Sequence, residues 1–158
     1  MIRLKIKGLI FNPTSNTPFV LLQTEDEKMI LPLSIGPFEA SSIIIAMEGI
    51  KTPRPLTHDL FIHFFKQHGF KIENIKIYDC LKGKYYAKLH YKKGFKRFAV
   101  EIRPSDGLAL AVRFSVPIYI KDEIVEMQPY NPTLIENSLP LTSQYKFHNP
   151  DSYNDYIM

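Results

Sequence analysis

The chain has 158 residues, of which 45% are hydrophobic and 23% charged, and its formal net charge is +4 at pH 7. This balance is typical of a globular protein large enough to have a core and argues against a disordered chain. No apolar run approaches the roughly 18 residues of a membrane span, and the alternating N-terminus does not resemble a signal peptide. We therefore expect a cytoplasmic protein without membrane contact.

The cysteine content and the charge distribution limit the kinds of site and partner that we expect for this chain. The single cysteine, Cys80, excludes an internal disulfide and a zinc–cysteine site, and we interpret it as structural. Residues 1–127 carry 19 basic and 13 acidic side chains, whereas residues 128–158 carry one basic and three acidic ones. A basic folded region is compatible with nucleic-acid binding, although charge alone does not establish it.

Alternating apolar and polar residues predict a first antiparallel meander. Its strands cover residues 2–11, 19–22 and 29–35, and turn residues separate them. Pro32 indicates either that the third strand lies at a sheet edge or that its pairing is interrupted, because proline cannot donate a ladder hydrogen bond.

A second meander is predicted over residues 71–78, 84–91 and 95–102. It gathers basic and aromatic side chains, namely Lys82, Lys84, Lys88, Lys92, Lys93, Lys96, Arg97, Tyr85, Tyr86, Tyr91 and Phe95. Such a face suits stacked bases and phosphates. The alternative is a solvated face whose lysines protect a sheet edge.

Residues 53–59 mark the start of a helix that we expect to begin at His58. Thr57 is suited to cap this helix, and Asp59 lies in the first turn, where the helix dipole favours a carboxylate. An ion pair between Arg54 and Asp59 would give these residues a purely structural role.

Two other helix starts have similar residues. Pro37 and Glu39 fit the first turn of a helix that ends near Gly49. Ser105 and Asp106 fit the N-cap and first turn of a third helix. If the three helix starts converge, their free N–H groups would form an anion pocket.

Together these elements predict an α+β fold with antiparallel or mixed sheets from two meanders, packed with three short helices in a single compact domain of residues 1–127. Residues 128–158 lack a sustained period, so we expect a C-terminal tail that is flexible or docked on a partner. Its aromatic residues could dock on a second copy in a homo-oligomer, and they are Tyr130, Tyr145, Phe147, Tyr153 and Tyr156.

Four motifs follow one another along the chain: LPLSIGPFEA at residues 31–40, PRPLTHDL at 53–60, YYA at 85–87 and RPSD at 103–106. In this order and at these spacings they resemble the bifunctional nuclease domain family. The resemblance covers roughly residues 1–125 and implies a compact α+β domain, common in bacteria, with nuclease activity on DNA and RNA. Gly107 departs from the family, which usually has alanine at this position.

The resemblance, carried over position by position, implies a set of site residues. The expected catalytic residues are Glu39, His58, Asp59 and Asp106, and the expected substrate-binding residues are Arg54, Thr57, Tyr86, Arg103 and Ser105. Mg²⁺ or Mn²⁺ would be held by Glu39, Asp59 and Asp106, because hard cations select oxygen ligands. His58 would act as base or acid, and the arginines would hold phosphate oxygens. The sequence has no nucleotide-cofactor motif.

The same residues also support a different hypothesis. Arginine–carboxylate pairs would fix the helix starts of a non-catalytic domain, which would bind nucleic acid, a nucleotide or a protein. The sequence does not choose between this domain and a nuclease.

Overall fold

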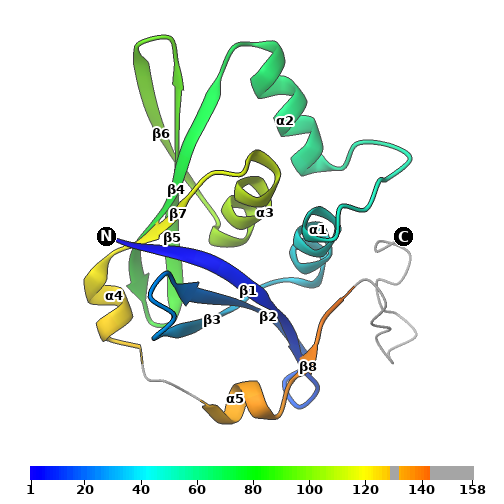
Figure 1. Cartoon of the computed structure of the whole chain (residues 1–158), viewed down its shortest axis with the longest axis vertical. Coiled ribbons are helices and arrows are strands. Elements are labelled where there is room, and N and C mark those ends of the chain that lie inside the picture. The colour runs from blue at the N-terminus through cyan, green and yellow to red at the C-terminus, as the bar shows by residue number, and fades with distance from the viewer. Residues whose placement is uncertain (129–131, 143–158) are drawn as a thin grey trace.

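A computed structural model describes residues 1–128 and 132–142 (Figure 1). In chain order the elements are β1 (Ile2–Asn12), β2 (Thr17–Thr24), β3 (Ile30–Ser34), α1 (Pro37–Met47), α2 (Thr57–Gln67), β4 (Lys71–Leu81), β5 (Lys84–Lys93), β6 (Lys96–Ile102), α3 (Pro104–Phe114), β7 (Ile118–Ile120), α4 (Asp122–Glu126), α5 (Pro132–Glu136) and β8 (Leu139–Pro140). None of the helices in these ranges has the length and apolar character needed to cross a membrane.

The two predicted meanders join in one eight-stranded mixed sheet. The strand order is β3-β2-β1-β7-β4-β5-β6, and β8 pairs with β1. The short strand β7 connects the two halves, because it pairs antiparallel with β1 and parallel with β4. The predicted α+β fold class is confirmed, and Pro32 lies in the edge strand β3 as predicted.

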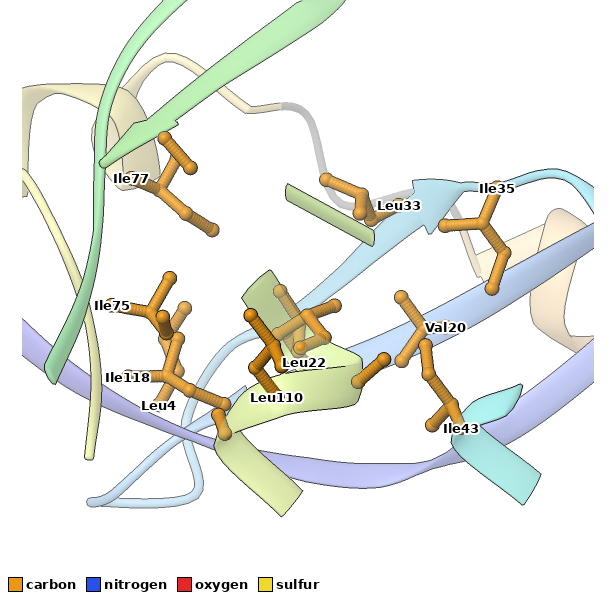
Figure 2. Close-up of a cluster of buried hydrophobic side chains, with 14 of the residues drawn as sticks. Leu4, Val20, Leu22, Leu33, Ile35, Ile43, Ile75, Ile77, Leu110 and Ile118 are labelled. Carbon is orange, nitrogen blue, oxygen red and sulfur yellow. The ribbon is translucent and has the colours of Figure 1, made fainter. Parts of the chain in front are cut away.

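A single core lies between the sheet and the helices. α1 packs on β2 and on α3, α3 packs on β4 and β5, and α2 packs on α3. Figure 2 shows the side chains that meet there from both meanders and from the helices: Leu4, Val20, Leu22, Leu33, Ile35, Ile43, Ile75, Ile77, Leu110 and Ile118. The two meanders therefore form one compact domain.

The predicted hydroxyl caps of α2 and α3 are wrong. The N-cap residue of α2 is Leu56, whose backbone N–H donates to the Asp59 carboxylate at 2.9 Å, while Thr57 is already helical. A carboxylate three residues into a helix can reach back in this way. The N-cap residue of α3 is Arg103, because a proline occupies the first helical position, and Ser105 is buried within the first turn.

Two five-residue helices, α4 and α5, were not predicted, because five residues are too few to show a helical period. Part of the predicted tail is packed on the domain: Leu141 is buried, and its N–H donates to the Leu9 carbonyl at 2.9 Å. Tyr130 and the aromatic residues of 143–158 lie outside the described residues, so their docking stays a prediction.

The burial of Leu141 gives a stability prediction. Leu141→Ala should lower the free energy of unfolding by about 2 kcal/mol or more, because it leaves a cavity at a side chain that is 4% exposed. Leu139→Ala is the matched control, since Leu139 is 47% exposed. Urea titration of both variants measures the difference, and equal effects would contradict the packing of this segment.

Candidate active site

A continuous set of polar contacts links the starts of α1, α2 and α3. His58 lies between Ser42 and Asp106: its Nδ1 is 2.7 Å from the Ser42 Oγ, and its Nε2 is 3.1 Å from the Asp106 Oδ1. Arg103 contacts the other side of Asp106, with Nε 2.8 Å from Oδ2, and its Nη1 lies 2.8 Å from the Glu39 Oε1. These five side chains form the polar network of the site.

Helix geometry explains how the polar network assembles. Glu39 and Ser42 are three positions apart in α1, so their side chains share one helix face. The chain lacks a side chain at Gly36, where a Cβ would collide with the Glu39 carboxylate. Glycine at this position therefore allows the carboxylate to turn back over the helix start.

Asp106 determines the protonation pattern of the polar network. Hydrogen bonds from His58 and Arg103 lower the pKa of Asp106 below its ordinary value, although partial burial opposes them. An ionised carboxylate only accepts hydrogen bonds, so Nε2 carries the proton of a neutral His58. The other ring nitrogen, Nδ1, then accepts a hydrogen bond from the Ser42 hydroxyl and is the basic atom of the imidazole.

The polar network lines a cavity of about 330 Å³. Residues at the starts of all three helices contribute to its wall, which consists of Phe38, Glu39, Ser41, Ser42, Ile45, Leu56, Thr57, His58, Arg103 and Asp106. Arg103 is 66% exposed there, and three of its five N–H donors point at Asp106 and Glu39. The guanidinium therefore keeps donors for a further oxygen ligand.

An apolar cavity of about 530 Å³ adjoins this site. The two cavities share Thr57, His58, Arg103 and Asp106, and the rest of the second wall comes from apolar side chains of α2, α3, β5 and β6 and from Phe70. His58 and Asp106 thus lie at the border between a polar and an apolar space.

Asp59, which was predicted to be catalytic, takes part in a separate contact. Its Oδ1 is 2.8 Å from the Nε of Arg113, whose Nη1 donates to the Ala109 carbonyl at 3.0 Å. Burial alone would raise the pKa of Asp59, but the hydrogen bonds from Arg113 and the Leu56 N–H outweigh it and lower the pKa. The predicted partner Arg54 is wrong, because Asp59 binds an arginine of α3 and so ties α2 to α3.

The other predicted residues are divided among several places. The structure brings together Glu39, Thr57, His58, Arg103 and Asp106 around one cavity. Arg54 is exposed in the loop before α2 and is not part of that wall. Tyr86 packs beside Tyr78, with ring centroids 6.4 Å apart, and Ser105 lines a different cavity of about 650 Å³ that also borders Glu39 and Arg103.

Sequence reasoning missed two residues that matter to this geometry. Ser42 stands in an apolar stretch of α1, and the signal that could have found it is its three-residue spacing from Glu39. Arg113 stands in an otherwise apolar part of α3, and a lone guanidinium there indicates a buried carboxylate partner.

The three carboxylates predicted to hold a metal do not meet. Within residues 1–128 and 132–142, no group of three or more His, Cys, Asp or Glu side chains is arranged to hold a metal ion. Asp59 binds Arg113, and Arg103 lies between Glu39 and Asp106. Because Mg²⁺ is often held by one or two carboxylates together with substrate oxygens, Glu39 and Asp106 are the carboxylates that would hold such an ion here.

Comparison with known proteins agrees with the motifs of the chain. The model of a family described as the bifunctional nuclease domain matches residues 20–132, a range that includes all five members of the polar network. The chain belongs to the bifunctional nuclease domain family. Family membership therefore rests on a region that includes the whole candidate site.

Two groups of relatives illustrate the range of the bifunctional nuclease family. An uncharacterized protein of Mycobacterium tuberculosis is 34% identical over 121 residues, which cover 77% of this chain and 72% of that protein. Bifunctional nuclease 2 of Arabidopsis thaliana is 24% identical over 116 residues, or 72% of this chain and 35% of the plant protein. Bifunctional nuclease 1 of Oryza sativa subsp. japonica is 23% identical over 109 residues, or 66% and 33%. The chain thus matches only about a third of each plant protein.

The Asp59–Arg113 contact predicts a pH-dependent loss of stability. Asp59→Asn should lower the free energy of unfolding at pH 7 by about 2 kcal/mol, because it removes a charge-assisted hydrogen bond to an arginine that is 5% exposed. The folded state lowers the pKa of Asp59, so its contribution is present at neutral pH and is lost as the pH falls below the ordinary value of 3.8. Denaturant titrations from pH 7 to pH 3 should therefore show that the difference in the free energy of unfolding between the wild type and Asp59→Asn becomes smaller as the pH falls.

Glu25→Gln is the control for this experiment, because Glu25 is exposed and its ion pair with Arg3 is exposed on both sides, so the stability at pH 7 should be nearly unchanged. A deficit for Asp59→Asn that stays constant down to pH 3 would show that the carboxylate charge does not stabilise the fold.

Proposed function

We propose that this protein hydrolyses phosphodiester bonds of DNA or RNA at the cavity lined by the polar network. The observation that carries the proposal is the contact of His58 with Asp106 beside an exposed Arg103. Membership of the bifunctional nuclease domain family supports it, as do the names of the plant relatives. The substrate is nucleic acid, whose phosphates suit the partly free guanidinium.

Each member of the polar network has a role in this proposal. His58 accepts the proton of the attacking water. The Ser42 hydroxyl, which is hydrogen-bonded to Nδ1, positions the ring and offers a path for that proton. Asp106 holds the tautomer and stabilises the imidazolium that forms. Arg103 binds phosphate oxygens, and Glu39 orients the guanidinium as a positioning residue.

Local charge favours a divalent cation in the same place. Glu39 and Asp106 bring two negative charges and Arg103 one positive charge, so the carboxylates would repel a phosphodiester. Mg²⁺ or Mn²⁺, held by these carboxylates and by substrate oxygens, would supply Lewis-acid stabilisation of the phosphate charge.

One observation favours the alternative of a non-catalytic binding domain. The contacts of Arg103 with both carboxylates already satisfy most of its donors, as in an ion pair that fixes a helix start. In that case the cavity would bind nucleic acid, a nucleotide or a protein without hydrolysis.

Hydrolysis of labelled single-stranded DNA and RNA separates the two functions. His58→Ala and Asp106→Asn should each lower kcat/KM by about 100-fold or more, the usual contribution of a general acid or base. His63→Ala is the matched control, because this exposed histidine lies on the same helix and should keep full activity. The assay is run in EDTA, Mg²⁺ and Mn²⁺, with melting temperatures measured in parallel.

Equal cleavage by all four proteins would indicate a contaminating nuclease and overturn the proposed site. Absence of cleavage in every metal condition, with folded wild-type protein that still binds the labelled strands, would favour the binding domain.

A further inference from the structure

The sheet ends at the edge strand β6 (Figure 1). Among the described residues β6 pairs only with β5, so the backbone groups along its other side have no strand partner. Each of the first six residues of this seven-residue strand is exposed. Natural sheets protect such edges or use them for pairing, because a free row of N–H and C=O groups is a template for another strand.

Apolar side chains accompany this free edge. Phe98 and Val100 share one face of β6 and are 38% and 44% exposed. Phe98 stacks on Tyr91 of β5, with ring centroids 5.1 Å apart. On α2, whose residues line the same apolar cavity as Val100, the side chains of Leu60, Phe61 and Phe64 are 62%, 46% and 52% exposed. The edge therefore has both unpaired backbone and an adjacent apolar surface.

We propose that β6 pairs antiparallel with β6 of a second copy of this chain about a two-fold axis at Ala99. In an antiparallel pair, directly opposed residues have their side chains on the same face of the sheet. A two-fold axis between two identical strands must therefore place one residue opposite its own copy. Ala99 is the middle residue of Lys96–Ile102, and pairing about it uses the whole strand. Its small side chain also suits the position where two identical residues oppose each other.

The central residues of β6 are complementary to themselves in this register, and the one unlike pair, Lys96 against Ile102, lies at the strand ends. Arg97 opposes Glu101 of the partner subunit, and Phe98 opposes the partner's Val100. Opposite charges and apolar side chains are the cross-strand pairs that stabilise a sheet. Arg97 is 75% exposed, and its guanidinium is 3.4 Å from Glu73 of its own chain, on the side of the sheet where the partner carboxylate would join it.

Neighbouring registers fit less well. An axis at Phe98 places Glu101 and Ile102 opposite turn residues that precede β6, and it sets Arg97 against Ala99 in place of Glu101. An axis at Val100 places Glu101 against Ala99 and leaves Lys96 and Arg97 without an opposed strand residue, because β6 ends at Ile102. The charge pattern thus selects Ala99.

The proposed pairing of β6 with a second copy would also change the surroundings of the candidate site. Val100 lines the apolar cavity that adjoins His58 and Asp106. With the axis at Ala99, Phe98 of the partner subunit lies against Val100, so a second copy extends the wall of that cavity. The dimer would therefore complete the apolar side of the site.

Site-specific cross-linking tests the register. Directly opposed Cα atoms in an antiparallel pair are about 4.5–5.5 Å apart, which is within the range that a disulfide spans. In a Cys80→Ser background, Ala99→Cys should form a covalent dimer under mild oxidation. Phe95→Cys is the control: Phe95 is fully exposed in the β5–β6 turn, so random collisions should cross-link it at least as well, whereas the proposed pairing should not.

Sedimentation equilibrium tests the charge pair over about two decades of protein concentration. The wild type should dimerise, Arg97→Glu should weaken the dimer at least tenfold in Kd, and the double variant Arg97→Glu with Glu101→Arg should restore it. A wild-type monomer throughout, no rescue by the charge swap, or faster cross-linking at residue 95 than at residue 99 would each overturn the proposal. None of these readouts requires nuclease activity, so the dimer and the proposed function can fail separately.

Discussion

The carboxylate of Asp106 is the group on which the candidate site depends. One of its oxygens accepts the His58 Nε2–H and the other accepts the Arg103 Nε–H, so a single side chain fixes the histidine tautomer and directs the guanidinium toward Glu39. These contacts lower the pKa of Asp106 below its ordinary value, so the carboxylate that accepts both hydrogen bonds is ionised at neutral pH and well into the acidic range. Because the three helices start far apart in sequence, these contacts also hold their first turns around one cavity.

The structure contains a second carboxylate–arginine pair, whose arginine is more buried than the arginine of the polar network. Arg113 is 5% exposed and joins α3 to the start of α2 through Asp59, whereas Arg103 is 66% exposed and faces the cavity. The two pairs have the same chemistry and differ in burial. A buried pair that loses one partner leaves an uncompensated charge, so the Asp59–Arg113 contact is suited to structure and the Arg103 contact to binding.

Much of the fold follows from local patterns in the sequence. Alternation marks both meanders, Pro32 marks an edge, and the acidic first turns mark three helix starts, because these signals depend on neighbouring residues. The union of the meanders through β7 could not be read in this way, since it depends on pairing between segments far apart in the chain. The pairing of Asp59 with Arg113 was missed for the same reason: Arg54 is close in sequence, but helix packing brings Arg113 close in space.

The tautomer of His58 is the most direct measurement of the central claim. Nitrogen-15 NMR at a pH where a reference histidine is neutral distinguishes a protonated from an unprotonated ring nitrogen. The contact with Asp106 predicts that Nε2 carries the proton and that Nδ1 does not, and that Asp106→Asn loses this preference. Exposed His63 serves as the internal reference in the same spectrum. A proton on Nδ1 in the wild type, or a spectrum of His58 unchanged in Asp106→Asn, would contradict the account.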